Sequence, residues 1–355
     1  GISFYTLQNI SYLVDVFRGQ IAAETSWTNF ALYVAYFPKL IAGPIERASK
    51  FLPQLNENRV VDDAQLARSF TLIFTGLIRK LLVGDILFAV MLTDVYQIPA
   101  KYTAPELLCW LVIYSFAIYN DFAGYTNIVR GVSGLFGIEL SPNFATPYFS
   151  RSFAEFWQRW HISLSEWLRD YIYFPLTRAL LRRNPSRYHP GNVILPPLVT
   201  MLVSGLWHGL SLHMLVWGGL HATYLIIERI IRLRGPVGPP KHNSVSRQAL
   251  AMFVVFMGVT IAWIPFGWGF PAALQFVEGL LNWSSFEIRY RRMFLMIPII
   301  AISLTMDVLQ FRSRDETVYL KWPRAVRATA MALIIWLILL VSSGDFQQEF
   351  VYQAF

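Results

Sequence analysis

The sequence predicts an all-α integral membrane protein. Of the 355 residues, 55% are hydrophobic and only 15% are charged, whereas a soluble domain carries about 25% charged residues. A soluble protein of this composition would expose more apolar surface than water tolerates. The 12 Trp and 17 Tyr fit a bilayer as well, because their rings settle at the level of the lipid headgroups. We therefore expect a multi-pass protein of the cell membrane (inner or plasma membrane), with membrane lipid around it.

Apolar runs define the predicted helices. A helix needs about 20 residues to cross a bilayer, and fewer where it is broken. The runs that qualify lie at 1–17, 69–92, 105–120, 192–207, 212–231, 249–268, 293–311 and 325–343. Segment 27–45 contains Pro38, Gly43 and Pro44, so we expect a broken or re-entrant piece there.

Segment 151–176 is amphipathic. Its apolar residues recur three or four apart, which places them on one helix face, yet its charges make it too polar to span. It is expected to be a helix at the membrane interface. The sequence shows no repeat and no second soluble domain, and it starts at Gly1 in apolar sequence. We expect one transmembrane domain, 1–355, that lacks its N-terminal helices.

The formal net charge of +8 resides largely in short loops between apolar runs. Residues 178–187, 229–247 and 312–327 are basic, and positive loops favour the cytoplasmic face. The turn of hairpin 192–228 should then lie toward the opposite face. This pattern orients the chain in a membrane, so no nucleic-acid partner is expected.

The main candidate for chemistry is His208, in the stretch Val-Ser-Gly-Leu-Trp-His-Gly that ends at Gly209. An imidazole inside a hydrophobic hairpin is costly to desolvate, and such residues are functional candidates by default. Flanking glycines allow backbone or substrate to approach closely. A pKa of about 6.5 suits a general base that takes a proton from a hydroxyl. The structural alternative is a histidine hydrogen-bonded between helices.

His161, in the segment Trp-Gln-Arg-Trp-His-Ile-Ser, is the second candidate. It is expected either as a second catalytic group or as a residue that lines a tunnel, with Trp160 beside it. The alternative is that the aromatic residues and Arg159 only anchor an interfacial helix. His221 is expected to support the catalytic region by hydrogen bonding.

No metal site is expected. His208, His213 and His221 are five and eight residues apart, which does not match the i, i+4 spacing of a helical metal pair. Cys109 is the only cysteine, so no thiolate cluster can bind zinc.

Asn120 and Asp121 are expected to close an apolar helix. Asp121 has three open roles: it orients a histidine, pairs with Arg130, or caps the following helix, and the two structural roles are favoured. Asp85 and Asp307 also lie within apolar runs. Either one would suit an ion or proton pathway, so a transporter or flippase stays an alternative.

Three blocks resemble the membrane-bound O-acyltransferase family. They are 1–19 with 36–55 (YFPKLIAGPIERASKFLPQL), 120–176, which contains WHISLS, and 202–229, which contains GLWHG. The order of the blocks and the two histidine motifs make the resemblance specific, and QEFVYQAF at 348–355 continues it. The chain is most similar to the alginate O-acetylation branch, with the teichoic acid D-alanyl transferases as near relatives.

The resemblance implies a ring of transmembrane and re-entrant helices around a central funnel or tunnel. It maps the essential family histidine onto His208 and the second one onto His161. An acyl group, acetyl in this branch, would pass from a cytoplasmic thioester donor (acetyl-CoA or an acyl carrier) to an extracytoplasmic acceptor, with no bound cofactor. The acceptor would be an exopolysaccharide, reached directly or through an extracytoplasmic SGNH-type acetyltransferase. Trp207, Asn120 or a backbone amide are candidates for the oxyanion donor.

Two departures from the family pattern bear on substrate preference. Thr177-Arg178 replaces a Gly-rich continuation, and Leu210-Ser211-Leu212 replaces a run that usually contains Ala. The alternatives to an acetyltransferase are D-alanyl transfer, a secondary transporter and a scaffold. A transporter predicts inverted repeats and paired acidic residues, and the sequence shows neither. A scaffold needs no buried histidine.

Overall fold

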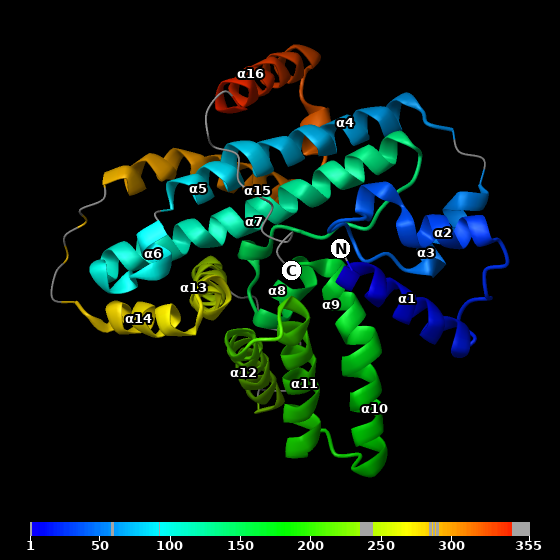
Figure 1. Cartoon of the computed structure of the whole chain (residues 1–355), viewed down its shortest axis with the longest axis horizontal. Coiled ribbons are helices and arrows are strands. Elements are labelled where there is room, and N and C mark those ends of the chain that lie inside the picture. The colour runs from blue at the N-terminus through cyan, green and yellow to red at the C-terminus, as the bar shows by residue number, and fades with distance from the viewer. Residues whose placement is uncertain are drawn as a thin grey trace. The chain divides into compact units, whose positions relative to one another are not determined.

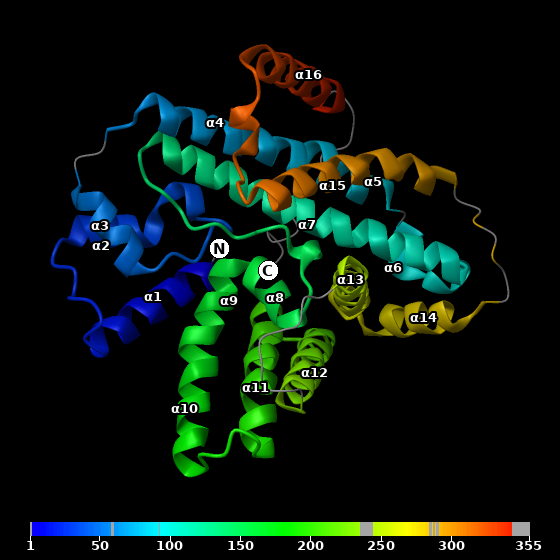
Figure 2. The ribbon, with the colours of Figure 1, turned by 180° about the vertical axis from the view of Figure 1, so that it is seen from behind.

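The computed structural model describes residues 2–57, 60–91, 93–234, 244–283, 286, 288 and 291–342. Over these ranges the regular structure is helical, with no strand, which confirms the all-α prediction (Figures 1 and 2). The predicted family-like tail 348–355 lies outside the described residues.

Five segments are long and apolar enough to cross a membrane. They are α7 (Ala104–Leu135), α11 (Pro190–His208), α12 (Leu212–Arg234), α13 (Val245–Gly267) and Met293–Ser313, which contains α15 (Met296–Ser313). Each overlaps a predicted run, and α7 extends beyond its run of 105–120. The runs at 1–17, 69–92 and 325–343 also form helices: α1 (Ile2–Phe17), α4 (Asp63–Leu77), the π-helix Ile78–Gly84, α5 (Asp85–Val90) and α16 (Arg324–Ser342). A multi-pass membrane protein is therefore the class that the sequence and the structure define.

The chain forms two compact units. Unit 1 contains Gly1–Val90, Phe116–Ala145 and Phe294–Phe355, and unit 2 contains Met91–Ser115 and Thr146–Met293. Helix α7 contributes its first residues to unit 2 and the others to unit 1. The single-domain organisation expected for 1–355 stays a prediction.

In unit 1, α4 and the π-helix that follows it pack closely against α7. A Cβ added to Gly124 would lie 2.8 Å from the carbonyl oxygen of Gly76, and one added to Gly131 would lie 2.6 Å from that of Ser69. The glycines therefore serve close helix contact. The expectation that Asn120 and Asp121 close a helix is wrong, because α7 continues unbroken to Leu135.

The expected break in segment 27–45 is present. Helix α2 (Trp27–Ala35) stops before Pro38, a 3₁₀ turn follows at Phe37–Lys39, and α3 (Ala48–Asn56) begins beyond the segment. These pieces pack around an aromatic core that includes Tyr12, Tyr33, Tyr36 and Phe51.

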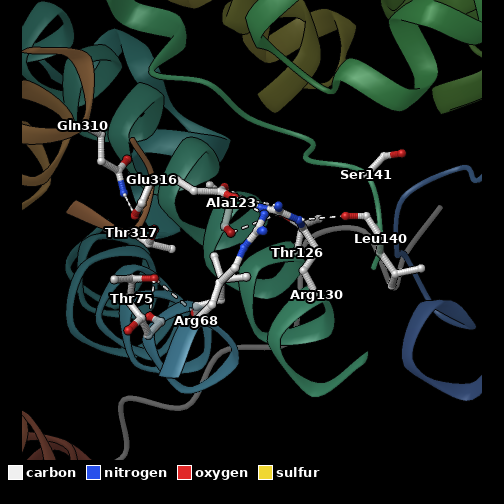
Figure 3. Close-up of polar contacts among 12 residues, drawn as sticks. Arg68, Thr75, Ala123, Thr126, Arg130, Leu140, Ser141, Gln310, Glu316 and Thr317 are labelled. Atoms are coloured by element: carbon white, nitrogen blue, oxygen red, sulfur yellow. Dashed lines mark hydrogen bonds and ion pairs between the residues drawn. The ribbon is translucent and has the colours of Figure 1, made fainter. Parts of the chain in front are cut away.

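The C-terminal part of α7 is fastened by an arginine. The Arg130 guanidinium donates two hydrogen bonds of 2.7 and 2.8 Å to the Glu316 carboxylate and one of 3.2 Å to the Leu140 carbonyl (Figure 3). Arg68 approaches the same carboxylate at 3.5 Å. Burial alone would raise the pKa of Glu316, but the two arginines outweigh burial and hold it below its ordinary value.

Unit 2 corrects the prediction of one interfacial helix over 151–176. The chain forms α8 (Phe153–Arg159), breaks at Trp160 and His161, and continues as α9 (Ile162–Leu168), a π-helix (Arg169–Tyr173) and α10 (Phe174–Arg183). The break arises because His161 adopts a left-handed backbone conformation, with φ of 42°, which no α-helix accommodates. The smaller helices of this unit are α6 (Thr93–Gln97), α14 (Phe270–Leu281) and the 3₁₀ turns Pro99–Lys101 and Pro147–Phe149. The 3₁₀ turn Arg291–Leu295 begins in unit 2 and ends in unit 1.

Candidate active site

His208 is the last residue of α11, at the turn of the α11–α12 hairpin. The two helices approach so closely that a Cβ on Gly205 would collide with the Met214 carbonyl, and one on Gly218 with the Met201 carbonyl. Small residues at these two positions thus permit backbone contact between the helices. The tight pairing fixes where the His208 backbone lies.

Aromatic rings surround the His208 imidazole. Its ring centroid lies 4.8 Å from Trp207, 5.1 Å from Trp217 and 5.2 Å from Phe266, each nearly perpendicular to it. The residue is only 5% exposed. In such a water-excluded site, hydrogen bonds to a reacting group are stronger than in water.

His161 occupies the break between α8 and α9 and caps α9. Its Nδ1 accepts a hydrogen bond of 3.3 Å from the Leu164 backbone N–H, so a neutral ring carries its proton on Nε2. Burial lowers the pKa of His161 to about 3, which keeps the ring neutral at physiological pH. Its centroid lies 5.8 Å from that of Trp207. Trp207 therefore contacts both candidate histidines.

His221 belongs to the same cluster and lies on α12. It is fully buried and stacks on Phe156, with ring planes 8° apart. The rings of Trp157 and Trp217 lie 4.9 and 5.0 Å away. Within the described part of the chain, neither ring nitrogen has a hydrogen-bond partner. The hydrogen-bonded support that we expected from His221 is thus not formed by these residues.

Trp160 is also buried, at 2% exposure. Its ring stacks on Phe156 at 5.5 Å and lies 5.1 Å from Trp263. The structure thus gathers His208, His161, Trp207, Trp160 and His221 within unit 2. Trp157 and Trp217 lie close in sequence to His161 and His221. Their contacts with the histidine rings depend on tertiary packing, so the sequence alone did not identify them as site residues.

Asn120 and Asp121 belong to unit 1, in a network of buried charges. The Asn120 amide accepts from Arg79 at 3.1 Å and donates to the Ser303 hydroxyl at 2.8 Å. Asp121 forms an ion pair with Lys80 at 2.5 Å. The alternatives in which Asp121 pairs with Arg130 or caps a helix are therefore wrong.

The other intramembrane acids are paired as well. Asp85 lies 2.6 Å from Lys80, and Asp307 lies 2.5 Å from Arg79 and accepts from the Tyr119 hydroxyl at 3.0 Å. Each carboxylate thus has a basic partner, which accounts for its burial without an ion pathway.

Unit 2 contains a cavity of about 530 Å³ beside the histidine cluster. Trp157 lies in its wall and contacts His221 with its ring. Arg229 also lines the cavity and donates a hydrogen bond of 2.6 Å to the Tyr173 hydroxyl. The sequence did not indicate this cavity, because its walls come from three separate segments, 154–174, 197–201 and 225–232.

Metal-binding geometry is not found in the ranges that the structure describes. There, no three His, Cys, Asp or Glu side chains gather closely enough to hold an ion. His213 is instead engaged by a 2.9 Å hydrogen bond between its Nδ1 and the Pro265 carbonyl.

Comparison with known proteins gives this membrane protein its family. The model of the MBOAT, membrane-bound O-acyltransferase family matches residues 17–268. The chain therefore belongs to that family. The match contains both candidate histidines and the cavity.

The chain is similar to three kinds of curated protein. The probable alginate O-acetylase of Pseudomonas putida is 36% identical over 266 residues, which cover 75% of this chain and 51% of the relative. The peptidoglycan O-acetyltransferase of Helicobacter pylori is 29% identical, covering 79% and 56%. The teichoic acid D-alanyltransferase of Streptococcus thermophilus is 28% identical, covering 78% and 70%. The chain spans about half the length of the first of these relatives.

Proposed function

We propose that this protein transfers an acetyl group from a cytoplasmic thioester to an extracytoplasmic polysaccharide acceptor, with His208 as general base. The observation that carries the proposal is the burial of His208 among aromatic rings at a helical hairpin turn, in a member of an acyltransferase family. A neutral imidazole buried in this way can act as a general base for a hydroxyl that lies within hydrogen-bond distance of its ring nitrogen.

In the proposed reaction, an acceptor hydroxyl attacks the carbonyl carbon of the thioester while a His208 ring nitrogen takes the hydroxyl proton. The new C–O bond forms, the C–S bond breaks, and the thiolate leaves and regains a proton from the imidazolium. Positioned general-base catalysis contributes about 10²–10⁴-fold. Orientation and stabilisation of the oxyanion supply the rest.

Trp207 is the favoured oxyanion donor among the three groups predicted. Its ring contacts both His208 and His161, and an indole N–H is a donor only. The Asn120 amide is already engaged by Arg79 and Ser303. His161 would act as a second group at the same centre, and its neutral ring would serve as a hydrogen-bond donor.

The donor is proposed to approach through the cavity next to Trp157. The charged side chains of its lining are Glu166, Arg169, Glu228, Arg229 and Arg232. A largely apolar cavity with a few charged groups in its wall suits a thioester arm better than a bulk polysaccharide. Acetyl-CoA and an acylated carrier both present such an arm. No further bound cofactor is required by this chemistry.

The acceptor is proposed from the relatives. The names of the Pseudomonas putida and Helicobacter pylori proteins place acetyl groups on alginate and peptidoglycan, so a polysaccharide acceptor is favoured here. Delivery to it would be completed by an extracytoplasmic SGNH-type acetyltransferase, in the inner or plasma membrane context. D-alanyl transfer is the alternative, because one relative carries out that reaction.

The test is complementation with the natural full-length gene in a deletion strain. We expect wild type to restore acylation of the exported polysaccharide and His208→Ala to lower it by about 10²–10⁴-fold. Mass spectrometry of the polymer measures the level, and the mass increment distinguishes acetyl from D-alanyl.

The matched control is His189→Ala, an exposed histidine before α11. It should behave as wild type, and immunoblots of membranes must show equal amounts of all variants. Full acylation with His208→Ala would refute the general-base mechanism and favour a scaffold or transport role.

A further inference from the structure

Unit 1 contains a second cavity, of about 490 Å³, bounded by α4, α15, α16 and the 3₁₀ turn Val318–Lys321. The helices that bound it are those labelled in Figures 1 and 2. Its walls are almost entirely apolar and include Phe74, Ile78, Ile302, Leu309, Met331 and Ile334. The hydroxyls of Thr71 and Thr75 bond back to α4 carbonyls. The wall thus offers nothing to a polar ligand over most of its length.

Polar groups enter the lining from the turn Val318–Lys321 and the start of α16, where Tyr319, Trp322 and Arg327 line the cavity. Arg327 Nε and the Tyr319 hydroxyl are buried atoms with no hydrogen-bond partner among the described residues. Arg327 also forms no ion pair there. Burial raises the pKa of Tyr319 to about 12, so its hydroxyl remains a hydrogen-bond donor. The cavity therefore contains two buried hydrogen-bond donors, Arg327 Nε and the Tyr319 hydroxyl, that have no acceptor among the described residues.

We propose that this cavity binds an anionic phospholipid, with its phosphate on Arg327 and Tyr319 and an acyl chain along the apolar wall. Leaving buried donors unsatisfied is costly, and a phosphate satisfies both with a charge opposite to Arg327. Basic pockets between transmembrane helices at the cytoplasmic side bind anionic headgroups.

The sequence also places the polar end of this cavity at the level of the lipid headgroups on the cytoplasmic side. Arg327 ends the basic stretch 312–327 that is predicted to face the cytoplasm. Trp322 packs against Tyr319 with ring centroids 5.3 Å apart, and such aromatic residues mark the headgroup level. A soluble anion would leave the apolar wall without a ligand. A zwitterionic lipid would bring its own cation close to the arginine.

The test is native mass spectrometry of the purified full-length protein with added phosphatidylglycerol or phosphatidylcholine of matched chains. We expect one phosphatidylglycerol to remain bound in preference to phosphatidylcholine. Arg327→Gln should weaken phosphatidylglycerol binding about fivefold, since one basic residue contributes about 1 kcal/mol near anionic lipid. Arg312→Gln is the control, because Arg312 is exposed and does not line the cavity.

A second pair of variants tests the cavity itself. Ala330→Phe fills it and should lower lipid binding, whereas Ala328→Phe, exposed on the same helix, should not. His208→Ala should keep the lipid, so the result does not depend on the proposed acyl transfer. Equal binding of both lipids, equal loss in Arg312→Gln, or full binding in Ala330→Phe would each overturn the proposal. Arg327→Gln carries the test alone if Ala330→Phe does not fold.

Discussion

The two units bury polar side chains in opposite ways. In unit 1, the side chains of Arg79 and Asp307 are 2% and 0% exposed and form a 2.5 Å ion pair. Lys80 forms ion pairs with both Asp85 and Asp121. In unit 2, the imidazoles lie among aromatic rings, and His221 has no hydrogen-bond partner in the described residues. In this charged network of unit 1 each carboxylate has a basic partner, whereas both ring nitrogens of His221 in unit 2 lack a partner among the described residues.

This difference separates structure from chemistry. A buried ion pair stays because removing one partner leaves an uncompensated charge. A buried neutral imidazole that bonds to nothing gains little stability from its nitrogens, and an apolar ring of similar shape would serve as well. A buried polar residue that lowers the stability of the fold and has no compensating interaction is a candidate for function. The charged residues of unit 1 are therefore expected to affect folding, and the histidines of unit 2 to affect transfer.

The largest effect on stability is expected in unit 1. Asp307→Asn should lower the free energy of unfolding by about 3–5 kcal/mol, because Arg79 loses its charged partner in a buried site. Thermal unfolding of the purified protein in one detergent measures the change.

Asp315→Asn provides the comparison, because Asp315 pairs at 2.9 Å with Lys321, whose side chain is 68% exposed. That substitution should change stability by at most about 1 kcal/mol. Similar stability in the two variants would show that the buried pair does not hold unit 1 together.

A smaller effect is expected at His161, where cap and chemistry can be separated. His161→Ala should cost about 1–2 kcal/mol, since it removes the bond to Leu164 N–H and puts Ala in the left-handed region. His161→Asn should restore most of that stability, because Asn caps helices well and tolerates this conformation.

Acyl transfer then decides the role of the ring. If His161 acts in the reaction, the Asn variant is stable but transfers poorly. Wild-type transfer by the Asn variant would show that His161 is only a cap. Measuring both variants in the same complementation strain, at equal expression, gives the comparison.

Much of the fold was predictable because the bilayer constrains the sequence. Residues 192–207 and 212–231 predicted α11 and α12 from apolar length alone, and the glycine-flanked His208 marked the hairpin turn. Apolar length does not, however, determine where a helix stops. Helix α7 passes through Asn120 and Asp121 because residues of α4 and its π-helix accommodate both its glycines and its charges.

The local break at His161 was not predictable from periodicity. Apolar spacing over 151–176 favours one helix, and only the left-handed conformation of a single non-glycine residue interrupts it. The partners of Asp121 and Asp307 were also hidden, since Lys80 and Arg79 lie far away in sequence. Motifs thus indicated which residues matter in unit 2, whereas pairing in unit 1 required the tertiary structure.

The smallest effect on stability, and the sharpest test of the comparison, is expected at His221. His221→Phe keeps a flat ring between Phe156 and Trp217 and removes two nitrogens that bond to nothing in the described residues, so the free energy of unfolding should stay the same or rise. Transfer should nevertheless fall about tenfold, because we expect one of these nitrogens to hydrogen-bond a reacting group, and the loss of one such bond corresponds to about that change in rate. Tyr224→Phe, one turn further along α12, is the control and should change neither quantity. A loss of about 2 kcal/mol in His221→Phe would show that the imidazole is structural, and the distinction between the two units would then fail at this residue.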